Sequence, residues 1–508
     1  MDISAWIRHR AEWSPARVAL HFGGAAVTYA ELEQRVARVA AGLADELGIG
    51  DGDRVAHLGY NSPVILELLF ACARLGAILV PLNWRLTVAE HIGILRSAEP
   101  RAIVVDTEFH AHARELHDAV PGFATVVAGP SPPGSDAPSW MTYAALTDRG
   151  ARARALGGGD LGRPVLIVYT SGTTGRPKGA VLTQAALHWN ALNSIAACDM
   201  TSADHVLTVL PMFHVGGLNI QTTPALLTGG TVTLTRRFDP DETLGLIETR
   251  RPTLFLAVPA VAQAVSRHPR FAAADLSSLR AMCTGSSTVP EAVMRPWLDR
   301  GIPVTQVYGM TETGPTALAL PIADAARKVG SCGKPVLHCE ARIVNEQGRD
   351  VAQGERGEIW LKGPNVMTGY WNDKEATDNA FAEGWLKTGD IAHQDDEGFF
   401  YVDDRKKDVV ISGGENIYPA ELENILSDHP DIAEAAVVGR ADPKWGEIPV
   451  ACIVAKPGAT LTRDDVLALF RNRVAGYKHP REVKFLDALP RTVMGKVQKA
   501  ELRRQISE

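Results

Sequence analysis

Helical and strand-like segments alternate through most of the chain, and this alternation limits the folds that the chain can adopt. Thr28 and Glu31 form a capping box before apolar residues at helical spacing, which predicts a helix over residues 28–43. A second helix is expected between Ser62 and Gly76, followed by a short apolar strand over residues 77–80. Repetition of this unit predicts an α/β fold with mixed, largely parallel sheets, which bind ligands beyond the carboxyl ends of their strands.

Length and charge narrow the classes of function. The chain has 508 residues, enough for about two to four packing units. Its 59 acidic and 52 basic residues give a net charge of -7, so we expect no binding of nucleic acid through an overall positive field. Six scattered cysteines lack the spacing of a zinc site, and we expect them to be reduced and mostly buried.

The predicted location is cytoplasmic. The first residues carry charges without an apolar core, so no signal peptide is expected. The most apolar long stretch, residues 64–82, contains Glu67 and Arg74. It is too short and too charged to span a bilayer, and no integral membrane segment is expected.

A loop rich in glycine and hydroxyl residues, Tyr-Thr-Ser-Gly-Thr-Thr-Gly-Arg-Pro-Lys-Gly at residues 169–179, follows a buried-strand pattern at residues 164–168. Its glycines allow backbone N–H groups to turn toward an anion, its hydroxyls add donors, and Lys178 adds positive charge. No Ser or Thr follows Lys178, so the loop is not a Walker A loop. A plain polar surface loop is the alternative, but the dense pattern favours a polyphosphate site.

Four further motifs follow this loop, and together the five resemble the adenylate-forming superfamily of acyl- and aryl-CoA synthetases, peptide-synthetase adenylation domains and firefly-type luciferases. The resemblance spans nearly the whole chain and is nearest to bacterial fatty-acyl-CoA and feruloyl-CoA synthetases. The four motifs are Tyr-Gly-Met-Thr-Glu at 308–312, Gly-Trp-Leu-Lys-Thr-Gly-Asp at 384–390, the hinge and following loop at 404–408 and 412–419, and Pro-Arg-Thr-Val-Met-Gly-Lys at 490–496.

The resemblance implies two domains. A large N-terminal domain, residues 1–403, is expected to hold ATP and the acyl pocket. A small, mobile α+β domain, residues 409–508, is expected to carry the catalytic lysine. The charged segment 404–408 lies between them, and the resemblance places Lys407 at the pivot of a hinge. From the residues alone, this segment is equally well explained as a solvated turn.

The resemblance also implies the reaction of an AMP-forming acid–CoA ligase. A carboxylate attacks the α-phosphate of ATP and expels pyrophosphate, and the thiol of coenzyme A then displaces AMP. The first step brings two anions together, so the site needs positive charge and a metal, here Mg²⁺. The expected partners are a small-molecule acid, ATP and CoA, and a homodimer is compatible with the resemblance.

Several residues receive roles in ATP binding from the resemblance. Lys496 is the expected catalytic lysine, Glu312 the Mg²⁺ ligand, and Thr311 a phosphate contact. Asp390 can accept two hydrogen bonds from ribose hydroxyls and Arg405 can donate to the same nucleotide, although an ordinary surface ion pair is the alternative. The expected ATP and AMP contacts are Thr170, Ser171, Gly172, Thr173, Thr174, Gly175, Lys178, Gly285, Ser286, Ser287, Tyr308, Gly309, Asp390 and Arg405.

Segment 211–217 resembles the motif whose histidine or aromatic residue walls the acyl pocket. His214, also a catalytic candidate, stands where amino-acid-adenylating relatives carry Asp, which argues against an amino acid substrate. A histidine packed in a core is an equally good interpretation. We expect an apolar acid, either a medium- or long-chain fatty acid or a hydroxycinnamic acid such as ferulate. The expected pocket residues are His214, Val215, Gly216, Gly217, Val258, Pro259 and Gly309.

The thiol tunnel is expected at the start of the C-terminal domain. Consecutive glycines suit a backbone that a slender pantetheine arm approaches closely. For Trp445 and Lys478 a core tryptophan and a solvated lysine are the alternatives. An acyl-AMP ligase that serves another acceptor, or a luciferase-like adenylating oxygenase, would share the first step. The expected tunnel residues are Gly413, Gly414, Glu415, Trp445 and Lys478.

Overall fold

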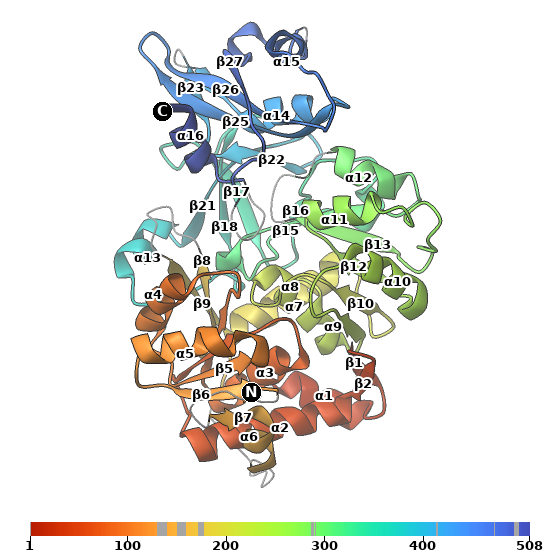
Figure 1. Cartoon of the computed structure of the whole chain (residues 1–508), viewed down its shortest axis with the longest axis vertical. Helices are drawn as coiled ribbons and strands as arrows, with labels where there is room; N and C mark the ends of the chain where they lie inside the picture. The colour runs from red at the N-terminus through yellow and green to blue at the C-terminus, as the bar shows by residue number, and fades with distance from the viewer. Residues whose placement is uncertain are drawn as a thin grey trace.

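The computed structural model describes residues 2–129, 140–149, 159–170, 177–285, 289, 291–412, 415–471, 473–491 and 497–507. Two large sheets with their helices form one end of the molecule, and a smaller sheet with α14, α15 and α16 forms the other (Figure 1). The α-helices are α1 (Ala5–Trp13), α2 (Tyr29–Leu47), α3 (Pro63–Leu75), α4 (Val88–Ala98), α5 (His110–Ala119), α6 (Tyr143–Arg149), α7 (Gln184–Ala197), α8 (Val215–Asn219), α9 (Thr222–Thr228), α10 (Pro240–Arg250), α11 (Pro259–Ser266), α12 (Glu291–Leu298), α13 (Lys374–Ala380), α14 (Pro419–Ser427), α15 (Arg463–Ala468) and α16 (Lys499–Ser507).

Two helices, α2 and α3, form where the sequence predicts them. Thr28 caps α2 through a complete capping box with Glu31, and Gly48 ends the helix in the left-handed conformation. Pro63 is the first residue of α3, and Gly76 ends it in the same way. The following strand is shifted slightly from the prediction, because it runs from Ile78 to Leu82.

One large sheet contains β8 and β9, the two strands that the phosphate loop connects. Its five pairings from β8 to β7 are parallel, whereas β9 pairs antiparallel with both β8 and β19. Residues 165–168 of β8 are buried, as the apolar pattern predicts. In spatial order the strands are β19 (Gly369–Tyr370), β9 (Lys178–Thr183), β8 (Pro164–Thr170), β4 (Ile78–Leu82), β3 (Arg54–Leu58), β5 (Ala102–Asp106), β6 (Ala124–Ala128) and β7 (Met141–Thr142).

The second large sheet supplies the strands after which most acyl-pocket candidates lie. Its central strands, from β1 to β14, are parallel, and antiparallel strands close both edges. In spatial order the strands are β16 (Lys334–Pro335), β15 (Leu318–Ala319), β14 (Val304–Tyr308), β13 (Ala281–Gly285), β12 (Leu254–Leu256), β10 (His205–Thr208), β11 (Thr231–Leu234), β1 (Val18–Phe22) and β2 (Ala25–Thr28). The predicted α/β class with mixed, largely parallel sheets is therefore confirmed.

A third sheet is antiparallel and carries the ribose-binding candidates. Its last strand continues through Asp403, Asp404 and Arg405, so the first two residues of the segment 404–408, expected as a turn or hinge, are β-strand. Cross-strand pairing with β21 explains this extension, because Asp390 lies directly opposite Arg405. The strands are β17 (Glu340–Val344), β18 (Gly357–Lys362), β21 (Trp385–Gln394), β20 (Phe381–Ala382) and β22 (Phe400–Arg405).

The C-terminal sheet has helices on both faces. Alternate residues of β25 point to opposite faces: Val437 packs with the core under α14 and α15, whereas Ala436 and Val438 pack with Leu502 of α16. This two-sided core fits the predicted α+β character of the segment. The strands are β24 (Glu415–Ile417), β23 (Val410–Ser412), β26 (Gly446–Ala455), β25 (Ile432–Asp442) and β27 (Glu482–Phe485).

All six cysteines are buried, in agreement with the prediction from their spacing. None of the helices in the described ranges combines the length and the apolar character needed to cross a membrane. The division into residues 1–403, 404–408 and 409–508 stays a prediction.

Candidate active site

The carboxyl ends of neighbouring parallel strands bring distant motifs to one edge of the second sheet. Strands β10, β12, β13 and β14 are adjacent in that order. Segment 211–217 follows β10, Val258 and Pro259 follow β12, Gly285 ends β13, and Tyr308 ends β14. Since ligands of parallel α/β sheets bind beyond these ends, the fold gathers predicted acyl-pocket and ATP-binding residues on the expected side.

A hydrogen-bonded group of three residues forms the candidate ribose site. The Asp390 side chain is only 3% exposed, and its Oδ1 lies 2.7 Å from Nε of Arg405. The Tyr308 hydroxyl donates to Oδ2 of Asp390 over 2.7 Å. Burial and the neighbouring Asp390 carboxylate raise the pKa of Tyr308 well above its usual value, so the phenol keeps its proton as a donor. The motifs at 308–312, 384–390 and 404–408 therefore meet.

The candidate metal ligand lies in a second polar group. Glu312 is 5% exposed. It lies in the 3₁₀ turn Thr311–Thr313, shortly after the end of β14. The Tyr370 hydroxyl donates to Oε1 of Glu312 over 2.8 Å, and the Lys178 ammonium lies 5.3 Å from the centre of the Tyr370 ring. The end of the phosphate loop, β19 and the Glu312 carboxylate are thus in contact.

The two groups influence each other electrostatically. Burial lowers the pKa of Arg405, but the charge of Asp390 and, more weakly, that of Glu312 raise it, and the net shift is upward. Arg405 therefore stays charged between the candidate ribose carboxylate and the candidate metal carboxylate. This placement suits a nucleotide whose sugar and phosphates lie along one path.

The phosphate loop joins two antiparallel strands, with Thr170 paired to Lys178 at its base. These two loop residues are described, and Thr170 Oγ1 donates to the Lys178 carbonyl oxygen over 3.4 Å. Other predicted contacts lie outside the described residues. These are Ser171, Gly172, Thr173, Thr174, Gly175, Ser286, Ser287, Gly413, Gly414 and Lys496.

His214 has a structural task in addition to its predicted place in the acyl pocket. It is the N-cap of α8, and its Nδ1 accepts a hydrogen bond from the Gly216 N–H over 3.0 Å. Val215, Gly216 and Gly217 are buried in the first turn of this short helix. Both interpretations of His214, pocket wall and packed histidine, are thus compatible with the geometry.

Two glycines expected to leave space for the acyl group have another reason to be glycine. A Cβ atom at Gly217 would overlap the Pro211 carbonyl oxygen, and one at Gly309 would overlap the Pro315 carbonyl oxygen. Close backbone approach therefore requires glycine at both positions. Their place in the acyl pocket stays a prediction.

The candidates for the hinge and the thiol tunnel lie on the C-terminal side of β22. The Arg503 guanidinium donates to the Lys407 carbonyl oxygen over 3.2 Å and thereby ties α16 to the predicted pivot. Trp445 is 39% exposed, which excludes the core tryptophan considered as an alternative. Lys478 is paired with Glu421 at 2.8 Å instead of being freely solvated, and Glu415 is exposed at the start of β24.

Tyr370 and a group that we call the arginine–aromatic cluster were not among the site residues predicted from the sequence. Partial burial and the charge of Arg237 lower the pKa of Arg85 in this cluster, so its cations repel one another. The Arg85 guanidinium lies 4.3 Å from the Trp84 ring centre, and that of Arg237 lies 5.2 Å from the Tyr60 ring centre. Two adjacent arginines that follow a buried strand are the sequence feature that could have indicated this cluster. The cluster comprises Tyr60, Trp84, Arg85, Phe213, Arg236 and Arg237.

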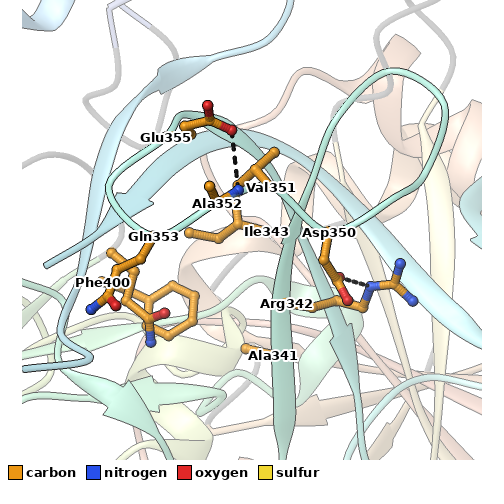
Figure 2. Close-up of a pocket in the computed structure, with 10 residues that line it drawn as sticks. Ala341, Arg342, Ile343, Asp350, Val351, Ala352, Gln353, Glu355 and Phe400 are labelled. Carbon is orange, nitrogen blue, oxygen red and sulfur yellow. Dashed lines mark hydrogen bonds and ion pairs between the residues drawn. The ribbon is translucent and has the colours of Figure 1, made fainter. Parts of the chain in front are cut away.

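A cavity of about 380 Å³ lies beside β17, and none of the predicted site residues that the structure describes lines it. Figure 2 shows Arg342 facing Asp350 at one side, with 2.8 Å between Nε and Oδ1. Glu355 accepts a hydrogen bond from the Ala352 N–H at the other side. These polar groups of its rim are thus engaged in contacts within the protein.

The described residues suit a magnesium ion that is shared with a nucleotide. Within the described ranges, no three His, Cys, Asp or Glu side chains gather to hold a metal by themselves. Glu312 offers one buried carboxylate whose Oε1 is bonded to Tyr370. Magnesium is commonly held by one or two carboxylates together with substrate phosphates, so this donor set fits.

Comparison with known proteins agrees with this geometry. The chain is 49% identical over 509 residues to the indoleacetate–CoA ligase of Aromatoleum aromaticum, covering 100% of this chain and 98% of the relative. It is 43% identical over 504 residues to the feruloyl-CoA synthase of an Amycolatopsis species, covering 99% of each. The solved o-succinylbenzoate coenzyme A synthetase of Bacillus subtilis, in complex with ATP and magnesium ion, superposes with a TM-score of 0.84 at 32% identity, covering 98% of this chain and 99% of that one.

Two family models match the chain. The model described as AMP-binding enzyme matches residues 7–371, and the model described as AMP-binding enzyme C-terminal domain matches residues 421–496. The first alone covers more than half of the chain and includes the Glu312 and Tyr370 region. The chain therefore belongs to the AMP-binding enzyme family.

Proposed function

We propose that this protein is an AMP-forming acid–CoA ligase that activates an aromatic carboxylic acid as its acyl-adenylate. The observation that carries the proposal is the contact of Tyr308 and Arg405 with the buried Asp390, beside the buried Glu312. This arrangement offers hydrogen-bonding groups for a ribose and a carboxylate for a phosphate-bound metal in one place. The names of the relatives, all CoA ligases or synthetases, support the same activity.

In the first half-reaction, a carboxylate oxygen of the acid forms a bond to the α-phosphorus of ATP while the bond to pyrophosphate breaks. Asp390 accepts hydrogen bonds from the ribose, and Arg405 remains charged beside the phosphates. Glu312 would hold Mg²⁺, which neutralises phosphate charge when bound. Thr170, Thr311 and Lys178 would donate to the phosphate oxygens.

In the second half-reaction, the CoA sulfur bonds to the acyl carbon, the bond from that carbon to the phosphate oxygen breaks, and AMP leaves. The thiol proton passes to solvent. We propose that residues 409–508 turn about Lys407 between the two steps, which withdraws Lys496 and brings the Glu415 loop to the thiol. The Arg503 guanidinium, which contacts the Lys407 carbonyl oxygen and the Asp408 carboxylate, lies at the pivot of that movement.

The arginine–aromatic cluster is our candidate site for the phosphates of CoA. Its Phe213 directly precedes His214 of the acyl motif, so the cluster adjoins the predicted pocket. Mutual repulsion between Arg85 and Arg237 would be relieved by a bound anion. Aromatic rings beside guanidinium groups also suit an adenine ring.

We propose an aromatic acid of the arylacetic or hydroxycinnamic type and place it ahead of a fatty acid. The two relatives of highest identity given above are named for indoleacetate and ferulate. Val258 and Pro259 after β12 supply apolar wall next to the β13 and β14 ends. An aromatic ring in such a pocket gains both burial and ring contacts.

The test is product analysis by mass spectrometry with ATP, Mg²⁺ and a panel of acids, each with and without CoA. The panel contains indoleacetate, ferulate, phenylacetate, octanoate and palmitate. We expect AMP and a thioester with at least one ring-bearing acid and little with the two fatty acids. Acyl-AMP without thioester would assign an acyl-AMP ligase instead, and a thioester with fatty acids alone would contradict the substrate proposal.

A further inference from the structure

Tyr370 is fixed by the strand that leaves the phosphate loop. Its strand β19 pairs with β9, in the register Tyr370 to Ala180 and Gly369 to Val181. The N–H of the next residue, Trp371, donates to the Gly179 carbonyl oxygen over 2.7 Å. The Tyr370 backbone therefore keeps a constant position relative to the base of the loop.

The Tyr370 side chain contacts two charged groups at once. Its hydroxyl donates to Oε1 of Glu312 over 2.8 Å, and the Lys178 ammonium lies 5.3 Å from its ring centre. A cation at this distance from a ring is attracted by the electron-rich face. The Tyr370 side chain thus links the end of the phosphate loop to the Glu312 carboxylate, which lies 58 residues before Tyr370 in the sequence.

We propose that Tyr370 is a positioning residue for the metal-binding carboxylate. Its hydroxyl occupies Oε1 of Glu312 and leaves Oε2 to bind Mg²⁺ as a single oxygen ligand. Magnesium demands near-ideal octahedral geometry, which a carboxylate binding through both oxygens would distort. The same hydrogen bond stabilises the buried charge of Glu312 when no metal is bound. The inference rests on the proposed function only in taking Glu312 as the metal ligand.

The test is Tyr370→Phe, which removes one hydroxyl and keeps the ring under Lys178. Calorimetry without any acid substrate measures ATP binding with Mg²⁺ and, separately, with the metal chelated. We expect the affinity for Mg·ATP to fall about tenfold, as for loss of one hydrogen bond to a charged group, and metal-free binding to stay unchanged. The half-saturating Mg²⁺ concentration for adenylate formation should rise similarly, with the KM for the acid unchanged.

A matched control is Tyr401→Phe, because the Tyr401 hydroxyl lies 3.4 Å from Asp395, outside the candidate site. This variant should leave every one of these values unchanged. A double variant with Glu312→Gln separates positioning from simple packing: Tyr370→Phe should cost almost nothing more in that background.

Equal losses with and without metal, or an equal cost in the Glu312→Gln background, would overturn the inference. Tyr370 would then only shape the pocket, and the ligase proposal would stand. If Glu312→Gln leaves the Mg²⁺ dependence unchanged, the positioning role and the metal role of Glu312 both fail. Thioester formation by the wild type is measured separately in the acid panel, so failure of the proposed activity is recognised independently.

Discussion

The two carboxylates assigned to ribose and metal binding, Asp390 and Glu312, are both almost completely buried, and each accepts a hydrogen bond from a tyrosine hydroxyl. A buried carboxylate without a donor would be strongly disfavoured, so each phenol holds its partner ready for the ligand. A phenol donates a hydrogen bond but carries no charge, which leaves the carboxylate able to bind a sugar or a cation.

Replacing Asp390 with Asn tests the ribose assignment at the scale of one residue. The amide keeps the shape but loses the charge and one acceptor, so the affinity for AMP should fall at least tenfold. Calorimetric titration with AMP measures this change. Asp395→Asn, which alters an Asp–Lys pair outside the site, is the control and should leave AMP affinity unchanged. Similar losses in both variants would show that Asp390 has no special part in binding AMP.

Gly309→Ala tests whether close packing, and not pocket space, requires glycine after β14. Its new Cβ would overlap the Pro315 carbonyl oxygen, so we expect the free energy of unfolding to fall by about 1–3 kcal/mol. Gly93→Ala is the control, since its Cβ meets no atom within 4 Å and alanine favours the α4 helix. Urea titration of both variants measures the difference. A Gly309→Ala protein as stable as the wild type would refute the packing explanation.

Pairs whose two residues both lie in the five motifs were easier to predict than a pair with one residue outside them. Asp390 and Arg405 each belong to a motif that the sequence displays, and their roles were assigned before their contact was known. Tyr370 belongs to none of the five motifs, and its contact with Glu312 depends on β19 pairing with β9. Such a contact is decided by tertiary structure, so spacing along the chain does not reveal it.

Among the elements, β22 makes contacts with helices that its sequence pattern does not indicate. Asp404, near the end of this strand, accepts a hydrogen bond from the Ala420 N–H in the first turn of α14. Lys499 of α16 lies 4.0 Å from the same carboxylate and 2.8 Å from Glu423. The last strand of the third sheet is thereby tied to α14 and α16 of the C-terminal segment. A run of charges predicts a solvated turn, and only the partners across the sheet explain why Asp404 and Arg405 are in a strand and why Asp404 is buried.

Asp404 makes the stability of this junction depend on pH. Burial raises its pKa to about 6, against the opposing charge of Lys499. Between about pH 4 and pH 6, Asp404 therefore holds a proton in the folded protein that it has already lost in the unfolded chain. This proton contributes about 3 kcal/mol to the free energy of unfolding. The contribution is complete below about pH 4 and is lost as the pH rises through about 6.

Asp404→Asn removes this titration. We expect the free energy of unfolding of the variant, relative to wild type, to increase by up to about 3 kcal/mol as the pH rises from about 4 to about 7. Urea titrations across that range give the measurement. Asp464→Asn, at a side chain 86% exposed, should show a flat difference. A flat difference for Asp404→Asn as well would contradict the raised pKa.

At the scale of the whole molecule, the α/β class and the membership of the family were predictable, because strand and helix patterns and five ordered motifs extend over most of the chain. The sheet order was not predictable, since it depends on which apolar strands pair. The position of the arginine–aromatic cluster is an example: Tyr60, Trp84 and Arg237 follow β3, β4 and β11, strands of two different sheets. Only the packing of these sheets brings them together.

Lys496 tests the proposal that one chain performs two half-reactions with different residues. A unit charge about 4 Å from the developing anion contributes about 4 kcal/mol at an effective dielectric constant of about 20. Lys496→Ala should therefore slow adenylate formation about a thousandfold and still convert supplied acyl-AMP and CoA to thioester. Rapid-quench assays of each half-reaction measure this. Equal loss of both half-reactions would exclude a role confined to the first.

A single-turnover experiment tests whether the acid is activated as an enzyme-bound adenylate before CoA reacts. Enzyme in excess over a ring-bearing acid is mixed with ATP and Mg²⁺, without CoA, and CoA is added later. We expect pyrophosphate and acyl-AMP to form together before CoA is added, and AMP and thioester to appear together afterwards. Release of ADP and phosphate, or no pyrophosphate until CoA is present, would contradict this expectation.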